Sequence, residues 1–429
     1  MGNLSALSGA PALVIFFIFN QFFTNFGLNL YPAFTFFITY GGFYILFRLY
    51  TGNGLNTQNR NIFLFHLFLL LYAFFIFYFY ELGFLQRETS SWWSISSLVK
   101  FISIIIATLV VIISPIQQIY KSLYLIRNIS YFIVAGSLFY YLLEPFGIGF
   151  FSTDELAGFR YNGGINSYII TGQFLIAGMI SHILLHQKSK FTKLLFAIGC
   201  FFFAVIATGD RTSILAILII LSLLFYRSGF DVTPFIFKVR KNLIFLFLVP
   251  SFSIFGFFQY QNIVSGEIDA YKSTIHRAAI TIRSYELFKD VFPIGGGPGS
   301  QTFLMNEKKI QTDFSEETGS TEALTAALMK EVDSFQGGVG RKQKLSPHNT
   351  YFDFLVPFGL IGAIFVFFVI LMQMGALKRI LFKKSSSTVI LDTYMVSALL
   401  FFMFSSLFNL WWLYIIFYRL LLVKKGLVH

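Results

Sequence analysis

Residues 61–80 read NIFLFHLFLLLYAFFIFYFY, a continuous stretch without a single Asp, Glu, Lys or Arg. About 20 apolar residues in a helix span the roughly 30 Å hydrocarbon core of a bilayer. In lipid only helices and closed barrels satisfy every backbone hydrogen bond, and this stretch lacks the alternation of a barrel strand. It therefore predicts a transmembrane helix.

Similar stretches recur along almost the whole chain. Hydrophobic residues make up 56% of the 429 positions and charged residues 12%, which is too apolar for a protein whose surface faces water. We predict an all-α fold, a polytopic transmembrane helical bundle of about twelve spans. The expected spans are Ala10–Gly27, Tyr31–Leu49, Asn61–Tyr80, Leu98–Ile113, Ile129–Leu143, Gly164–Leu185, Phe191–Thr208, Thr212–Tyr226, Leu243–Tyr260, Tyr351–Leu371, Val389–Phe404 and Ser406–Leu422.

The net charge of +12 indicates how these spans are oriented. Cytoplasmic loops of membrane proteins carry an excess of Lys and Arg, so the charge does not indicate a nucleic-acid partner, and we expect none. Basic residues fill alternate connections, and nearly all acidic residues lie in the others. The basic residues of the expected cytoplasmic side are Arg48, Arg60, Lys121, Arg127, Lys188, Lys190, Lys193, Arg227, Lys238, Arg240, Lys241, Lys378, Arg379, Lys383, Lys384, Lys424 and Lys425. Both termini are then cytoplasmic.

The longest connection lies on the opposite side of the membrane. It divides the chain into a transmembrane bundle at 1–260, a large outer loop at 261–350 and the last three spans at 351–429. Within the loop we predict an amphipathic helix at Thr274–Val291, a glycine-rich turn at Gly295–Gly299 and a second helix at Thr321–Phe335.

No cofactor-binding pattern accompanies this turn. It lacks the Lys-Ser/Thr pair of a phosphate-binding P-loop, and the chain has no helical His-Glu-x-x-His motif. Cys200 is the single cysteine, which excludes a thiolate metal site. We expect neither a metal nor a cofactor.

Arginines on the outer side are the candidate functional residues, because they oppose the usual charge bias. A guanidinium group offers a planar fork to phosphate oxygens and keeps its charge, so it can stabilise a departing anion. His348, at the start of a span, suits a general base acting on a hydroxyl. The candidate arginines are Arg160, Arg211, Arg277 and Arg283.

Each candidate also has a structural interpretation. Arg211 can pair with Asp210 beside a helix cap, and Arg160 can anchor its segment at the membrane interface. Arg277 and Arg283 can form solvated ion pairs with neighbouring acids. A lone interfacial histidine is more often structural than catalytic. The residues alone leave these alternatives open.

Two motifs carry a resemblance to a known family. His348-Asn349, followed after nine residues by Gly359-Leu360-Ile361-Gly362, resembles the His-Asn-x9-Gly-x-x-Gly signature of the O-antigen ligase and polymerase superfamily. The stretch TGDRTS at 208–213 is similar to its Thr-x-Ser-Arg-Thr element, with Asp210 where Ser is common.

Two further stretches occur in the order that this family has them. FRYNGG at 159–164 is similar to its arginine-containing loop before a span. The stretch from Arg277 through Pro293 to Gly299 resembles its Arg, helix, Pro and Gly-x-Gly segment, with a spacing that leaves open whether Arg277 or Arg283 is the matching arginine.

The resemblance implies a GT-C-like membrane glycosyltransferase of the bacterial inner membrane, with its active site on the periplasmic side. The implied donor is an undecaprenyl-pyrophosphate-linked oligosaccharide held among membrane lipid, without a metal. His348 would deprotonate or orient the acceptor hydroxyl, and Arg211 would act beside it. Arg160, Arg277 or Arg283, and Asn349 would contact pyrophosphate or glycan.

Three functions remain open at this stage. A polymerase adds the glycan to another lipid-linked repeat unit, works beside a chain-length regulator (a polysaccharide co-polymerase), and is the function that we favour. A ligase transfers the glycan to the lipid A core. A lipid-linked oligosaccharide flippase or other transporter would instead place ionisable residues around a central cavity.

Overall fold

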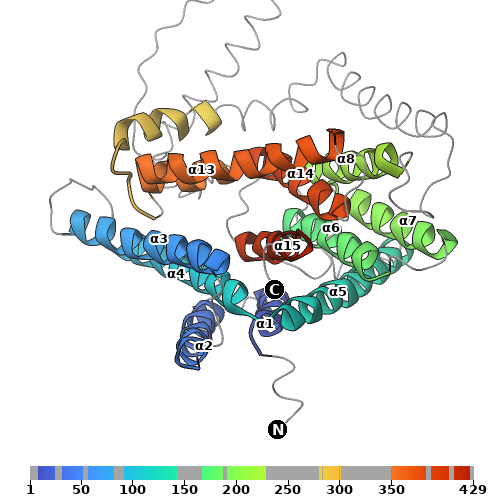
Figure 1. The fold of residues 1–429 in the computed structure, drawn as a ribbon, viewed down its shortest axis with the longest axis horizontal. Coiled ribbons are helices and arrows are strands. Elements are labelled where there is room, and N and C mark those ends of the chain that lie inside the picture. Colours follow the sequence, from blue (N-terminus) through green and yellow to red (C-terminus); the bar gives the residue numbers. More distant parts are fainter. Residues whose placement is uncertain are drawn as a thin grey trace, which may run out of the picture.

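The computed structural model describes residues 8–24, 31–51, 57–81, 91–143, 167–186, 191–228, 280–282, 284–298, 300, 349–382, 388–404 and 410–425. Every regular element in these ranges is a helix (Figure 1). The labelled helices are α1 (Ala10–Thr24), α2 (Tyr31–Tyr50), α3 (Thr57–Glu81), α4 (Ser91–Ile113), α5 (Ile116–Leu143), α6 (Tyr168–Leu185), α7 (Phe191–Ala207), α8 (Arg211–Ser228), α13 (Thr350–Phe382), α14 (Val389–Phe404) and α15 (Trp411–Lys424). The predicted all-α class is confirmed.

These helices lie over every predicted span except Leu243–Tyr260, which falls outside the described residues. Among the described residues, three helices are long and apolar enough to cross a membrane: α3 over Asn59–Phe79, α6 and α13. Shorter apolar helices accompany them at Ala10–Gln21, Ser97–Ile113, Phe196–Ala207, Arg211–Leu224 and Val389–Met403. The number of about twelve spans and the division at 260 and 350 stay predictions.

Helix α5 corrects one predicted boundary. The span was expected to begin at Ile129, yet the helix begins at Ile116, directly after Ser114 and Pro115. The stretch before Ile129 is polar enough to look like a loop, but no helix-breaking residue follows Pro115, and proline is tolerated at a helix start. Hydropathy therefore misplaces the start of this helix.

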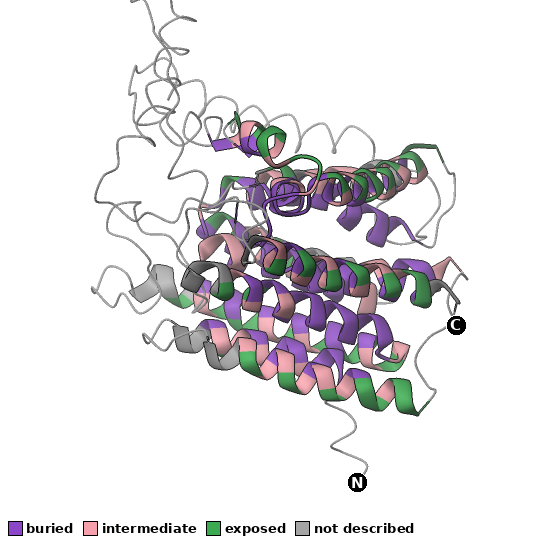
Figure 2. Cartoon of the chain, turned by 90° about the vertical axis from the view of Figure 1, so that its left-hand side faces the viewer, coloured by how far each residue is buried: buried purple, intermediate pink, exposed green. Residues whose placement is uncertain are grey.

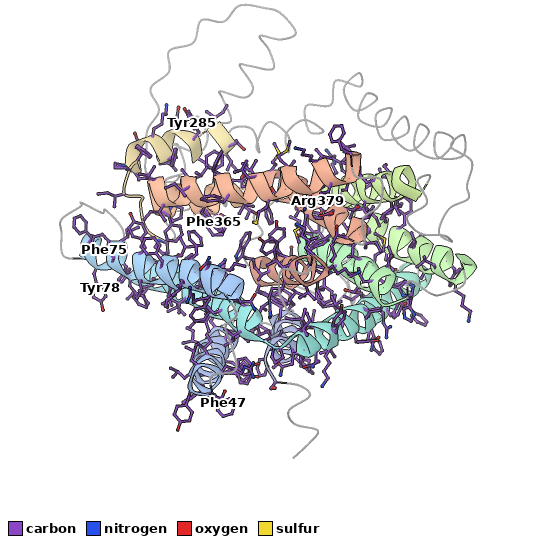
Figure 3. All side chains as sticks on the ribbon, in the orientation of Figure 1. Phe47, Phe75, Tyr78, Tyr285, Phe365 and Arg379 are labelled. Carbon is purple, nitrogen blue, oxygen red and sulfur yellow. The ribbon has the colours of Figure 1, made fainter. Side chains whose placement is uncertain are left out.

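Many apolar side chains point outward from the bundle. Phe47, Phe75 and Tyr78 stand away from α2 and α3 (Figure 3), and each is more than half exposed. Between residues 360 and 374 of α13 the exposed apolar side chains form one stripe, made of Leu360, Ile364, Phe367, Phe368, Leu371 and Met374. Such a surface suits a helix that faces lipid rather than water.

Helix α15 lies in the middle of the helices (Figure 1), and its residues are buried on nearly all sides. The buried positions run through the centre of the bundle in Figure 2. Near its end, Arg419 is 4% exposed and its Nη1 donates to the carbonyls of Val111 and Ser114. These carbonyls end α4, where a cation is favoured by the helix dipole. Arg419 lies inside the predicted span Ser406–Leu422 and was not among the predicted candidate residues.

Helices α13 and α14 form an antiparallel pair. Nε of Arg379 donates to Oδ1 of Asp392 at 3.0 Å and Nη2 donates at 2.7 Å, while the hydroxyl of Thr388 donates to Oδ2 at 2.7 Å. Tyr394 packs on Phe417, with ring centroids 4.2 Å apart. This places the basic ends of α13 and α15 together.

Candidate functional site

A short helix of the large loop packs onto the first turns of α13. This loop helix, residues 280–282 and 284–291, lies above α13 in Figure 1. Ile280 and Leu287 are 1% exposed and meet the fully buried Val356 of α13. Phe288, Val291 and Phe352 pack around them. The predicted helix Thr274–Val291 is confirmed over its described part, and it lies against the segment that follows His348.

The glycine-rich turn continues this contact through the backbone. Gly296 N donates to Val356 O at 2.9 Å, and Gly297 N donates to Pro357 O at 2.9 Å. In the other direction Leu360 N donates to Pro293 O at 2.8 Å. We call this contact, between residues 293–297 and 356–360, the glycine junction. It joins two motifs that the sequence shows more than 50 residues apart.

Only glycine fits at two positions of the glycine junction. Gly295 has φ +95° and Gly359 has φ +54°, values that side-chain-bearing residues rarely adopt. A Cβ atom on Gly359 would lie closer than 3.0 Å to Pro293 O, and one on Gly295 would meet Pro357 O as closely. The close approach of the two backbones thus explains why both positions require glycine.

The backbone of α13 folds back at Gly359, whose φ/ψ of 54° and −125° are not helical. The hydroxyl of Tyr351 donates to Oε1 of Gln373 at 2.8 Å. In an unbroken helix these residues would be about 33 Å apart, at 1.5 Å per residue. Residues 350–358 (the short helix) therefore run back beside residues 360–382 (the long helix). The predicted single span Tyr351–Leu371 is therefore interrupted at Gly359.

Two residues cause this bend. Pro357 lacks an N–H group for the helical ladder, and Gly359 accepts the left-handed backbone. Gly362 then passes close to Phe354 O, where a Cβ atom would not fit. The sequence showed Pro357 inside the predicted span Tyr351–Leu371, so the signal was present but was not used.

Asn349 caps the short helix. Its Oδ1 accepts from Tyr351 N at 2.9 Å and from Phe352 N at 3.4 Å, the usual N-cap arrangement. Asn349 is 9% exposed and Thr350 1%, so this helix end is buried in the bundle. His348, which precedes Asn349 in the sequence, lies outside the described residues.

Arg211 begins α8 and is exposed. The cap of α8 is Asp210: its Oδ2 accepts from Ser213 N at 3.0 Å and from the Ser213 hydroxyl, and Oδ1 accepts from Thr212 N at 3.4 Å. The structural interpretation of this motif included a helix cap, and the cap is confirmed, with Asp210 as the capping residue. Within the described residues no ion pair of Arg211 is found.

The link between α7 and α8 packs on the beginning of α6. Gly172 lies so close to Ser213 that a Cβ atom on it would clash with the Ser213 side chain. Helix α6 begins at Tyr168, capped by Ser167. The segment that carries Arg160 precedes this cap but lies outside the described residues. The start of α6 and the TGDRTS motif are therefore neighbours.

Helix α14 connects the two described parts of the site. It packs against both α8 and α13. Its Phe402 contacts Tyr351 of the short helix edge to face, with ring centroids 5.9 Å apart. Of the predicted site residues the structure thus describes Arg211 and Asn349, on two helices that share α14 as a neighbour. Arg160, Arg277, Arg283 and His348 lie outside the described residues.

The described histidines make hydrogen bonds to neighbouring groups of the protein. Nδ1 of His66 lies 2.8 Å from Ile62 O and so carries the proton, while its Nε2 accepts from Trp411 Nε1 at 3.1 Å. His182 bonds the Tyr131 hydroxyl, and His186 Nε2 lies 2.7 Å from Arg127 Nη1. Across the described ranges no three His, Cys, Asp or Glu side chains could hold a metal ion together.

The fold and this site define a multispan helical membrane protein in which a loop helix is fixed onto a folded-back helix. Residues 195–367 match the family model described as O-antigen ligase. This match supports the resemblance to the O-antigen polymerase and ligase superfamily that the motifs carry. Arg160 lies before the match. No curated protein and no solved structure matches the chain.

The family supports a function of the O-antigen ligase or polymerase type, in a membrane glycosyltransferase-like enzyme that uses lipid-linked oligosaccharides. The matched segment contains the TGDRTS motif, the loop helix and the glycine junction. The features that the sequence singled out and the contacts described above therefore fall in one family domain.

Proposed function

We propose that the protein is a surface-polysaccharide (O-antigen) polymerase of the bacterial inner membrane. It transfers a glycan from undecaprenyl pyrophosphate onto another lipid-linked repeat unit at the periplasmic face. The observation that carries this proposal is the glycine junction, because it ties the arginine-bearing loop segment to the helix that follows His348. Two motifs with separate expected roles thus share one rigid contact.

The proposed reaction is a direct displacement at the anomeric carbon. The acceptor hydroxyl oxygen forms the new glycosidic bond as His348 takes its proton, and the bond from the anomeric carbon to pyrophosphate breaks. Undecaprenyl pyrophosphate leaves with the bonding electrons. Arg211, Arg160 and either Arg277 or Arg283 offset the charge on this leaving group, and Asn349 holds the end of the short helix in place.

The apolar surfaces of the helices suit the polyprenyl tail of such a donor, and the large loop would close over the glycan. Exclusion of water strengthens the arginine contacts and prevents hydrolysis of the donor. No step in this scheme needs a metal or a nucleotide sugar, and a chain-length regulator is the expected protein partner.

Ligation is the second candidate, because the matching family model is described as O-antigen ligase. The chemistry at the donor is the same, and the acceptor becomes the lipid A core. A flippase is a weaker candidate, since the described ionisable groups within the helices, such as Asp392 and His66, are engaged in local hydrogen bonds.

The test uses purified protein in nanodiscs with undecaprenyl-pyrophosphate-linked repeat units, followed on a glycan gel. We expect a ladder of products, with losses of about 100- to 1000-fold for His348→Ala and Arg211→Ala. Arg60→Ala is the matched control, because Arg60 is an exposed arginine at the start of α3. Products that need added lipid A core would make the protein a ligase, and no product with either acceptor would reject both enzymes.

A further inference from the structure

The hydrogen bond between Tyr351 and Gln373 has no part in the chemistry above, yet it joins the two arms of α13. We propose that Tyr351 and Gln373 are positioning residues that fix the place of the His348–Asn349 end within the bundle. The inference rests on the proposed function, because it concerns the group that takes the acceptor proton.

The short helix needs a second attachment besides the glycine junction. At its far end it is held by Gly359, and nine residues at 1.5 Å each place Asn349 about 13 Å away from that turn. A helix held only at one end can swing about its hinge. Tyr351 lies only two residues from Asn349, so its bond to Gln373 attaches the Asn349 end of the short helix.

The hydrogen bond between Tyr351 and Gln373 is buried, and the ring and the hydroxyl of Tyr351 make separate contacts. Gln373 is 1% exposed and Tyr351 9%, so water does not compete freely for the hydrogen bond. Phe402 of α14 contacts the ring of Tyr351, whereas the hydroxyl alone reaches Gln373. Ring packing and hydrogen bond can therefore be separated by replacing tyrosine with phenylalanine.

A further contact fixes the middle of the short helix. Phe354 packs on Phe365 of the long helix and on Trp411 of α15, with ring centroids 4.5 and 5.4 Å apart. Apolar contacts of this kind set the distance between the two arms but tolerate sliding. The hydrogen bond between Tyr351 and Gln373 fixes the position of the short helix along the long helix. A general base carried by the short helix needs such a fixed position.

The expected effect is on turnover and not on donor binding. A displacement of about 1 Å in a catalytic group can cost about 100-fold in rate. We expect Tyr351→Phe and Gln373→Leu each to lower kcat by about 10- to 100-fold, with KM for the lipid-linked donor changed less than about twofold. Because both variants remove the same bond, the double variant should be no slower than the slower single variant.

Tyr394→Phe is the matched control. Tyr394 is a buried tyrosine of α14, 7% exposed, whose ring packs on Phe417 of α15. We expect its kcat to equal that of the unchanged protein. Thermal unfolding in nanodiscs is measured for all variants, so that kcat refers to folded protein, and Gln373→Leu serves if Tyr351→Phe does not fold.

The His348→Ala background separates this inference from the proposed function. If His348 is the group that is positioned, Tyr351→Phe adds no further loss to His348→Ala. Full turnover of folded Tyr351→Phe and Gln373→Leu, with His348→Ala inactive, would overturn the positioning role alone. Full turnover of His348→Ala would instead reject the proposed role of His348. Equal, additive losses in both backgrounds would show a structural effect.

Discussion

At the residue scale, the site depends on glycines whose role is geometric. Gly295 and Gly359 allow the backbones of the loop turn and of α13 to approach, and a side chain on either would displace both. The sequence marks these glycines as part of two motifs but does not show that they touch, because the contact joins segments distant along the chain. Gly375, by contrast, sits in the regular long helix.

Gly359→Ala should destabilise the protein and remove activity. The substitution places a side chain at φ +54° and forces Pro293 O away, at a cost of about 1–3 kcal/mol for the backbone strain alone. Thermal unfolding and polymer formation in nanodiscs measure the two effects. Gly375→Ala is the control: its Cβ atom would meet nothing nearer than Arg379 Nη1 at 3.5 Å, and alanine favours a helix by about 0.5–1 kcal/mol. Equal stability of the two variants would contradict the glycine junction.

Substitutions of Asp210 distinguish its role as a helix cap from an effect of its charge beside Arg211. Asn keeps one of the two acceptor oxygens, so Asp210→Asn should destabilise α8 less than Asp210→Ala, which should lose about 1 kcal/mol. Thermal unfolding of both variants is the measurement. A large loss in the Asn variant would mean that the carboxylate charge, rather than the cap, stabilises this turn.

At the element scale, the loop helix and the short helix form one unit through a few buried apolar residues. Leu287→Ala should weaken this docking by about 2–5 kcal/mol, the usual cost of removing a buried leucine side chain. Activity should fall while the helical content of the bundle stays the same, and the loop should become more sensitive to protease. Ile282→Ala is the control, because Ile282 on the same helix is 40% exposed. Unchanged protease sensitivity in Leu287→Ala would contradict the docked arrangement.

The helices themselves could be predicted from the sequence, and Pro357 marked an interruption, but the reversal of the chain at Gly359 could not be predicted. Apolar stretches of about 20 residues are read directly from hydropathy, which located the described helices, although α4 and α5 begin earlier and α13 ends later than the predicted spans. The stretch 351–371 is apolar apart from Asp353, so hydropathy alone gives no sign that the chain reverses at Gly359. The reversal depends on Pro357 and on contacts with residues 293–297, which are tertiary information.

At the scale of the whole molecule, pairs of helices bring together residues that no local pattern connects. Arg419 reaches the end of α4, and α14 lies between α8 and α13. The motifs predict which residues belong to the candidate site. That the helices of Arg211 and Asn349 share a neighbour follows only from the packing of the helices. The chemistry of arginine and histidine suggested the roles, and α14 packs against both α8, which carries Arg211, and α13, which Asn349 caps.

The arrangement of charges predicts which end of the molecule faces the cytoplasm. The structure brings Arg379 and the end of α15 to one side, as Tyr394 and Phe417 show, and basic residues mark the cytoplasmic side. With Cys200→Ser as background, a cysteine at Glu316 of the large loop should react with a membrane-impermeant maleimide in cells whose outer membrane is permeabilised. A cysteine at Lys425 should react only after the inner membrane is opened. The reverse pattern would place the large loop in the cytoplasm, where the proposed periplasmic transfer could not occur.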